Sequence, residues 1–396
     1  MPARILVAGG GIGGLAAAVA LARRGHSIEV LEQAEAFAEV GAGIQLGPNV
    51  TRRLKALNLL EAASRVAARP QAIAVRDAQD GSLLARLPLA ESIERKYGTP
   101  YLCMHRADLH GVLLAAARDL APRVELDTGA CITQVAARGD TVCLGSSKLQ
   151  AWEGDGLIGA DGLWSLVRAR VVEDSPPPRA TGHTAWRALA RGETLPARLR
   201  SNEVQVWLGE RLHAVAYPVR GGDWLNLVVI AEEPVREAGG DPTDWDQQAN
   251  LAALQAATGD RCAGVHPLIE AMPHWRAWQL NDRPPLAGPH EMVRDRVALL
   301  GDAAHPMLPY LAQGAGMAIE DAVSLAERVG DGRAADLPLA FSRYAAARWQ
   351  RNARVQARSL RNGEVFHASG ARRLARDAAL RVLGSHLLDA PWLYEG

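Results

Sequence analysis

The sequence predicts an α/β protein in which a discontinuous doubly wound domain carries an inserted antiparallel-sheet domain and is followed by C-terminal helices. Three observations predict this class. A short apolar run near the start leads straight into spaced glycines and an Ala/Leu-rich segment. Two later apolar runs end in Asp161-Gly162 and in Gly301-Asp302, as strands that lead into tight turns do. Between these two runs, residues 183–231 alternate between apolar and polar positions, which is typical of antiparallel strands.

The first elements are a strand, a helix and a second strand. Arg4-Ile-Leu-Val-Ala8 has strand character and runs into Gly9-Gly-Gly-Ile-Gly-Gly14. The helix from Leu15 to Arg24 carries two arginines in its last turn, where they complement the helix dipole, and it ends at Gly25. Ser27 to Leu31 is the second strand. This order is that of a βαβ unit with a glycine-rich first turn.

The βαβ unit predicts a dinucleotide site. Gly9 permits the tight turn, Gly11 lets a pyrophosphate approach the backbone, and Gly14 allows close packing of helix on strand, so the helix N-terminus faces the phosphates. Glu32 stands 18 residues beyond Gly14, the spacing of a carboxylate that accepts hydrogen bonds from a ribose. The two further Gly/Asp turns, far along the chain, indicate a cofactor as long as a flavin dinucleotide. The alternative is a glycine-rich turn with no ligand.

The next elements are shorter. A second glycine-rich bend, Gly41 to Gly47, contains Gly43 and Ile44 and is suited to contact a flat ring. Residues 51–70 are expected to form a helix, 71–103 are less regular, and 105–120 form an Ala/Leu-rich helix. Strands are predicted near 123–127, 130–136, 141–144 and 157–160, then a helix from Trp164 to Arg170, and the triple proline at 176–178 marks a crossing between domains.

The inserted segment predicts a three-stranded meander. Glu203 to Leu208, Leu212 to Val219 and Leu225 to Ile230 alternate, and the residues between them suit turns. On the middle strand a period of two places His213 and Tyr217 on one face, about 13 Å apart at ~3.3 Å per residue. These two side chains are therefore expected to line one pocket from its two ends.

The remaining chain is mostly helical. Helices are expected between about 245 and 277, a buried strand at Val297 to Leu300, a helix from Gly314 to Val329, and Ala/Arg-rich helices from about 335 to 390. The predicted domains are a discontinuous wound domain (1–70, 104–182 and 282–334), a substrate domain (71–103 and 183–281) and a C-terminal helical region (335–396). We expect the arginine-rich run from Arg348 to Arg358 to be a solvated helix face.

Composition excludes several functional classes. Lys+Arg and Asp+Glu are equal at 44 each, which gives no electrostatic case for nucleic acid or an anionic membrane. The four cysteines form no CxxC pair, so neither a zinc site nor a redox dithiol is indicated. For Glu320-Asp321, a capping or salt-bridge role is favoured over metal binding, because no histidine stands at helical spacing. With no signal-like start and no apolar run of ~18 residues, we expect a cytoplasmic protein that binds a small molecule.

Several motifs resemble those of the single-component FAD-dependent aromatic hydroxylases, over essentially the whole chain up to about residue 360. They are the first glycine turn, Gly154 to Arg168 with its Asp161-Gly162, and Leu300-Gly-Asp-Ala-Ala-His-Pro306 with Gln313 to Ala322. Arg95 to Tyr101 and His105 to His110 make the chain most similar to the members that act on hydroxylated aromatic acids. These are salicylate hydroxylase, 3-hydroxybenzoate 6-hydroxylase and 6-hydroxynicotinate 3-monooxygenase.

The resemblance implies FAD as the cofactor and assigns its contacts. Glu32 would hold the adenosine ribose, Arg106 would lie near the phosphate-ribityl part, and Asp302 would bond the ribityl chain. Asp161 would bridge flavin and nicotinamide, although capping of the following helix is an alternative role. The start of a late helix would face the pyrimidine edge of the flavin, where negative charge accumulates. The full set of expected cofactor residues is Gly9, Gly11, Ile12, Gly13, Gly14, Glu32, Gln33, Gly43, Ile44, Arg106, Asp161, Asp302, Gly314, Ala315 and Gly316.

The resemblance also implies a reaction. NADH or NADPH would bind transiently, because the chain has no second glycine fingerprint, and the reduced flavin with O2 would form a C4a-hydroperoxide that hydroxylates an electron-rich ring. A phenol ionises near pH 10 and a histidine near 6.5, so His213 is expected to act as the base. Tyr217 would orient the ring or bond its carboxylate, and the Pro309 carbonyl would face the substrate hydroxyl. A homodimer is expected from relatives.

Other interpretations remain open. His213 as a partly solvated strand residue and Tyr217 as a core aromatic are the structural alternatives to their catalytic roles. The same flavin chemistry could act on a larger, non-acid aromatic or polyketide metabolite. A third candidate is an FAD-binding scaffold or redox sensor without turnover.

Overall fold

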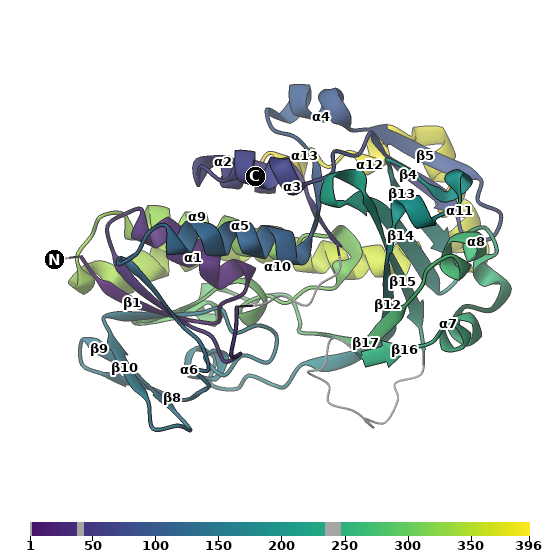
Figure 1. Cartoon of the computed structure of the whole chain (residues 1–396). Coiled ribbons are helices and arrows are strands. Elements are labelled where there is room, and N and C mark those ends of the chain that lie inside the picture. Colours follow the sequence, from purple (N-terminus) through teal and green to yellow (C-terminus); the bar gives the residue numbers. More distant parts are fainter. Residues whose placement is uncertain (1, 38–42, 234–246) are drawn as a thin grey trace.

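The computed structural model describes residues 2–37, 43–233 and 247–396 (Figure 1). Gly41 and Ala42 of the expected glycine-rich bend lie outside this part of the chain. Two large sheets dominate the molecule, one at each end of the view in Figure 1. The chain passes between them several times, and both are built from segments that are far apart in the sequence.

The wound sheet has six strands. Its central strands are buried apolar runs, as parallel strands covered on both faces must be, and its order is β18-β19-β11-β1-β2-β7. All neighbours pair in parallel except β18 with β19. The strands are β1 (Arg4–Ala8), β2 (Ser27–Leu31), β7 (Val124–Asp127), β11 (Gly156–Gly159), β18 (Val293–Arg294) and β19 (Val297–Leu299). The predicted doubly wound class is confirmed.

Helices cover this sheet, and their buried faces join its apolar core. α1 (Ile12–Ala22) packs on α5 (Arg106–Arg118) and on α9 (Gly314–Val329), which has the bounds expected from the sequence. The single helix expected over 51–70 is wrong. The chain forms α2 (Pro48–Ala56) and α3 (Leu60–Val66), because Asn58 adopts a left-handed φ of 49° between them.

A three-stranded sheet of β8 (Ile132–Arg138), β9 (Thr141–Ser146) and β10 (Ala151–Gly154) lies beside the wound sheet. The helix expected from Trp164 to Arg170 is wrong in its extent, since only α6 (Arg168–Val171) is helical. The Asp161 carboxylate accepts hydrogen bonds from the N–H groups of Leu166 and Val167, at 2.8 and 3.0 Å. It therefore holds residues 162–167 as turns and delays the helix.

The second sheet has eight strands in the order β16-β17-β12-β15-β14-β13-β4-β5. The predicted meander is confirmed: β13 (Val204–Gly209), β14 (Leu212–Val219) and β15 (Trp224–Glu232) are antiparallel neighbours. β4 (Ala72–Asp77) and β5 (Leu83–Pro88) extend the sheet from an earlier part of the chain, with β4 parallel to β13. The residue boundaries of the proposed domains remain a prediction.

The segment from 245 to 277 is not wholly helical. Its described part begins with β16 (Gln247–Ala249), continues through α7 (Leu251–Thr258) and α8 (His266–Glu270), and reaches β17 (Trp275–Asp282). β17 pairs with the long strand β12 (Arg179–Arg191), and this pairing overrides the local helical preference. Residues 71–103 are also more regular than expected, since they hold α4 (Ala90–Tyr97) and the start of β6 (Leu102–His105), which pairs with β3 (Gly43–Leu46).

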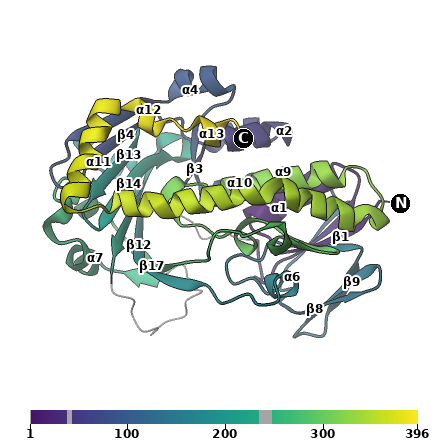
Figure 2. The ribbon, with the colours of Figure 1, turned by 180° about the vertical axis from the view of Figure 1, so that it is seen from behind.

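C-terminal helices tie the two sheets together. α10 (Leu337–Phe366) runs behind the molecule from the wound sheet to the eight-stranded sheet, where α11 (Gly370–Leu383), α12 (Ser385–Leu388) and α13 (Pro391–Tyr394) follow (Figure 2). The solvated face expected for the arginine-rich run is wrong at Arg348, which is 5% exposed.

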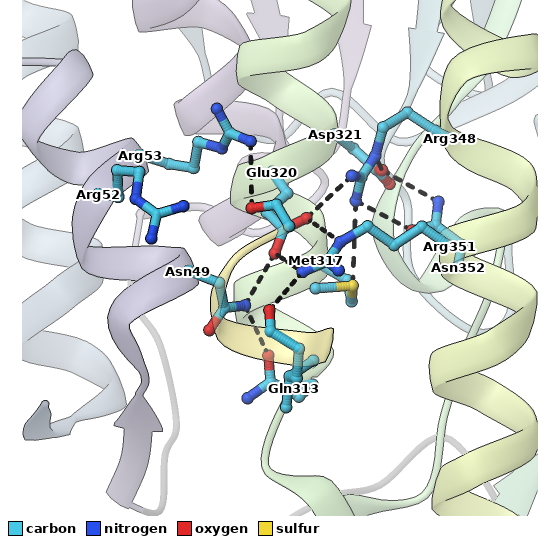
Figure 3. Close-up of polar contacts among 12 residues, drawn as sticks. Asn49, Arg52, Arg53, Gln313, Met317, Glu320, Asp321, Arg348, Arg351 and Asn352 are labelled. Atoms are coloured by element: carbon cyan, nitrogen blue, oxygen red, sulfur yellow. Dashed lines mark hydrogen bonds and ion pairs between the residues drawn. The ribbon is translucent and has the colours of Figure 1, made fainter. Parts of the chain in front are cut away.

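Arg348 belongs to a buried ionic network (Figure 3). Its guanidinium donates to Asp321 at 2.8 Å and to Glu320 at 2.9 Å, and Arg351 donates to Glu320 at 2.6 Å. Asn49 of α2 donates to the same Glu320 carboxylate at 2.8 Å. The favoured salt-bridge role of Glu320-Asp321 is therefore what the structure shows, and the network joins α2, α9 and α10.

Candidate active site

A cavity of about 260 Å³ lies where the two sheets meet. Distant parts of the chain line it: strand β3, the start of α5 at Arg106, the pair Leu163 and Trp164, the middle of β14 with its neighbour β15, the end of β17, and the segment from Asp302 to the start of α9. Most of its wall is apolar. The polar lining residues are Gln45, Arg106, His213, Tyr217, Gln279, Asn281, Asp302 and Gln313.

The first glycine turn is built as its residue types predict. Gly9 has a φ of +104°, and a Cβ there would stand 2.4 Å from the carbonyl oxygen of Ala160. A Cβ at Gly14 would stand 1.9 Å from the carbonyl oxygen of Gly9, so only glycine lets α1 approach β1 this closely. Within the described chain no side chain caps α1, whose N-cap is Gly11, and its first N–H groups suit a phosphate.

Glu32 follows β2 beside this turn. One of its carboxylate oxygens accepts the N–H of Gly10 at 2.8 Å, and the other accepts the N–H of Ala34 at 2.9 Å. The carboxylate therefore braces the glycine turn, and each oxygen keeps a second lone pair for a ribose hydroxyl. The next residue, Gln33, is exposed. Its contact with a cofactor, like that of Ile12 and Gly13, stays a prediction.

The late turn and α9 form the other end of the predicted cofactor site. Asp302, in the turn after β19, lies with its Oδ1 3.9 Å from where a Cβ of Gly314 would stand. Gly314 and Ala315 line the cavity, and no side chain among the described residues caps this helix start. Gly316 does not line the cavity. A Cβ there would lie 2.6 Å from Val50, so its smallness serves the packing of α9 on α2.

The Asp161 carboxylate is hydrogen-bonded within its own turn. Besides Leu166 and Val167, its carboxylate accepts the hydroxyl of Ser165 at 2.5 Å. Burial raises the pKa of this carboxyl against the effect of these hydrogen bonds. The carboxylate thus fixes the turn before α6, whose own N-cap is Val167, and the bridging role stays a prediction. The next residues, Leu163 and Trp164, line the cavity.

His213 and Tyr217 line the cavity from the same face of β14, as the period of two requires. His213 is 2% exposed, and burial together with the neighbouring His367 and His183 holds the pKa of its imidazole well below the usual value. Burial raises the pKa of Tyr217, so its phenol remains neutral. The Tyr217 ring lies against β3, where a Cβ at Gly43 would stand 2.4 Å from it.

Pro309 also lines the cavity, at the start of a short 3-10 turn (Pro309–Leu311). Its carbonyl accepts the N–H of Ala312 at 3.0 Å, which fixes the direction of the carbonyl and leaves one lone pair. Arg106, the first residue of α5, lines the cavity as well, near the strand β3 that carries Gly43 and Ile44. The roles predicted for Pro309 and Arg106 stay predictions.

Sequence reasoning missed two groups of lining or neighbouring residues. The first is Trp278 to Asn281 on β17, where the alternation of apolar and polar residues in Trp-Gln-Leu-Asn could have indicated a strand. The second is the pair His367 and Tyr310, which surround His213 with ring centroids 5.1 Å away in both cases. No local sequence pattern indicates a role for His367, because it lies next to His213 only as a result of how the long helix α10 packs.

The residues fit a flavin dinucleotide. Two helix N-termini without side-chain caps, on α1 and α9, lie at the two glycine-rich turns. Within the described chain, the buried indole N–H groups of Trp164 and Trp278 have no hydrogen-bond partner, and both residues line the cavity. A polar, planar ligand with many acceptors would satisfy these donors. Fold and site together define a flavin-dependent oxidoreductase.

Comparison with known proteins gives the family. Residues 3–359 match the family described as FAD binding domain. The chain is 39% identical over 376 residues to 3-hydroxybenzoate 6-hydroxylase of Polaromonas naphthalenivorans (strain CJ2), covering 94% of this chain and 90% of the relative. It is 39% identical over 394 residues to 3-amino-4-hydroxybenzoate 2-monooxygenase PtmB3 of Streptomyces platensis, covering 99% and 95%. The solved structure of Klebsiella pneumoniae HpxO with FAD and uric acid matches with a TM-score of 0.84 at 26% identity, covering 97% and 94%.

The chain belongs to the FAD-binding monooxygenase family and is an FAD-dependent aromatic monooxygenase. The resemblance stated from the sequence is confirmed, as is the fold class. Among the described helices, none has both the length and the apolar character needed to cross a membrane.

Proposed function

We propose that this enzyme hydroxylates a small hydroxylated aromatic acid of the salicylate, hydroxybenzoate or hydroxynicotinate type, using O2 and NADH or NADPH. Oxidative decarboxylation of the salicylate type is included. The observation that carries the proposal is that His213 and Tyr217 line the same cavity as Asp302, Gly314 and Ala315. Two relatives at 39% identity are named for hydroxybenzoates, which supports an acid with a ring hydroxyl.

The size of the cavity supports a single ring. At about 260 Å³ it lies slightly below the range of ~300–1,000 Å³ that is common for ligand sites. Apolar side chains such as Val215, Val228 and Leu280 form much of its wall and suit an aromatic face. Both features favour a small aromatic acid over a polyketide.

The proposed division of labour follows from the chemistry of each group. Bound FAD would accept two electrons from the nicotinamide and activate O2 for transfer to an electron-rich ring. His213, neutral because its pKa is depressed, has a ring nitrogen able to accept the phenolic proton and so enrich the ring. The neutral hydroxyl of Tyr217 can donate to the carboxylate or the ring oxygen. The buried wall keeps water from the reacting atoms.

A substrate panel tests this function. Salicylate, 3-hydroxybenzoate, 4-hydroxybenzoate and 6-hydroxynicotinate are each supplied with NADH and separately with NADPH, while nicotinamide oxidation, peroxide and product mass are recorded together. At least one acid is expected to raise nicotinamide oxidation several-fold and to yield product one oxygen heavier, or its decarboxylated equivalent. Nicotinamide loss that ends only in peroxide for every acid would contradict the proposal. No stimulation by any aromatic compound would favour a scaffold or redox sensor.

Three further predictions accompany the proposed function. They are the choice between NADH and NADPH, the homodimer and the cytoplasmic location. The panel settles the first, and sedimentation of the purified protein measures the second. Stimulation by a larger non-acid phenol, but by none of the acids, would transfer the proposal to the alternative substrate class.

A further inference from the structure

A line of three polar side chains leads from the cavity towards the surface. The Nδ1 atom of His213 lies 2.8 Å from Nε2 of His367, and Nδ1 of His367 lies 3.2 Å from a carboxylate oxygen of Glu232. The three residues come from β14, the end of α10 and the end of β15. His213 lines the cavity, whereas the other two do not.

The hydrogen bonds determine which nitrogens carry protons. A carboxylate only accepts, so His367 must donate its Nδ1–H to Glu232. The Nε2 of neutral His367 is then an acceptor, and His213 must donate its Nδ1–H to it. This leaves Nε2 of His213 as the unprotonated nitrogen, which is the state that a base beside a phenol requires.

Exposure and charge both favour movement of positive charge outward along this line. The exposed side-chain fraction rises from 2% at His367 to 30% at Glu232, and His213 as a residue is 2% exposed. Hydrogen bonds from His367 and Arg211 lower the pKa of Glu232 to about 2, so it is a carboxylate at neutral pH. His367 is also the C-cap of the 30-residue helix α10, and the negative end of a helix dipole stabilises an imidazolium.

Other charged or titratable groups surround the line. His183 on β12 contacts the hydroxyl of Tyr310 through Nδ1, and its Nε2 lies 4.0 Å from Glu232. Arg211 pairs with Glu232 at 3.0 Å, and Asp282 on β17 acts on His183 from a greater distance. Burial and the two neighbouring histidines oppose a lasting positive charge on His213. A proton accepted by His213 therefore needs a route onward.

We propose that His367 and Glu232 form a proton exit route that transfers the phenolic proton from His213 to solvent. The proposal rests on the function proposed above, in which His213 is the base. The substrate O–H bond breaks as Nε2–H of His213 forms. Nδ1–H of His213 then breaks as Nε2–H of His367 forms, and the imidazolium is held between Glu232 and the end of α10. Release of the Nδ1 proton of His367 to water beside Glu232 completes the transfer, with no change in oxidation state.

The test measures the ionisation of a bound phenol in oxidised enzyme, separately from catalytic turnover. Oxidised, FAD-loaded enzyme is mixed with 3-hydroxybenzoate, whose phenol ionises near pH 10, in weakly buffered solution, and phenolate absorbance and a pH indicator are followed together. The variants are His367→Gln, which can still accept from His213 but cannot carry a proton, Glu232→Gln, and His213→Gln. His386→Gln on the exposed face of α12 is the matched control.

The expected result for His367→Gln is phenolate formation and hydroxylation slowed on the order of 10-fold or more at pH 6.5–7. The deficit should shrink as pH approaches the phenol's own pKa, because the substrate then enters already ionised. FAD affinity and flavin reduction by the nicotinamide should match the control. Glu232→Gln should show the same pattern more weakly.

Three outcomes would overturn the route. They are wild-type ionisation in His367→Gln, a deficit of equal size at every pH, and loss of activity with EDTA. The last would assign His183, Glu232 and His367, whose ligand atoms lie within 4.8 Å of one another, to a metal ion. A failure of His213 as the base can be told apart from a failure of the route, because the probe would then ionise normally in the His213→Gln variant. Failure of the proposed substrate class would appear in the wild-type enzyme itself, where the probe would neither bind nor change its phenolate absorbance.

Discussion

At the scale of single residues, the sharpest constraint is the contact between Gly14 and Gly9. A Cβ at Gly14 would lie 1.9 Å from the Gly9 carbonyl oxygen, and both partners are backbone. We predict that Gly14→Ala loses FAD and lowers the thermal midpoint by several degrees, because α1 must move away from β1. Gly111→Ala in α5 is the control: nothing lies within 4 Å of its Cβ, so it should be neutral or stabilising by about 0.5–1 kcal/mol. Flavin absorbance after gel filtration and thermal melts measure both. A yellow, stable Gly14→Ala protein would contradict the assignment.

His213 also predicts a pH dependence of stability. Its folded pKa lies below the unfolded value of about 6.5, so the unfolded chain binds more protons as the pH falls through this range. Stability is therefore fully present above pH ~6.5 and is lost below it. We expect His213→Gln to flatten the decline of unfolding free energy between pH 7.5 and 5.5. The lowered pKa of Glu232 acts only in more acidic solution. Urea melts at four pH values measure the slopes, and parallel slopes would refute the effect.

At the scale of elements, the ionic network between α9 and α10 carries a stability prediction. Arg348 is the partner of two carboxylates, Glu320 and Asp321, which are 1% and 0% exposed. Arg348→Leu should destabilise the fold by about 3–5 kcal/mol, because it leaves buried negative charge with less compensation. Arg358→Ala, at an exposed position of the same helix, should change stability by less than about 0.5 kcal/mol. Denaturant titration of the pair gives the comparison, and similar midpoints would show that the network is dispensable.

The same element scale explains where sequence reasoning worked. The meander and the helix from Gly314 to Val329 were predictable from their own sequences. Apolar residues recur with a period of two in the strands and with a period near 3.6 in the helix. The start of β17, residues 275–277, was wrongly placed in a helix, because its strand state depends on pairing within the sheet, mainly with β12, which begins nearly 100 residues earlier. Arg348 was misread for a related reason. An arginine next to polar residues looks solvated until a carboxylate from another helix covers it.

At the scale of the whole molecule, the candidate active site is assembled from segments that are far apart in the sequence. The cavity takes lining residues from β3, β14, β17 and the start of α9, and α10 then brings His367 against the side chain of His213 on β14. The C-terminal helices thus connect the two sheets and complete the surroundings of the proposed base (Figure 2). Removal of these helices would expose His213 as well as the core.

The cofactor turn, the wound fold class and the placement of His213 and Tyr217 on one strand face were predictable, because each depends on residue types at short, fixed spacings, and the family followed from the resemblance of its motifs. The packing of Gly316 against Val50 was not predictable in this way. Only the tertiary structure joined His213 to His367 and Glu232. Contacts across 100 residues or more depend on how whole elements pack, and no local spacing encodes them.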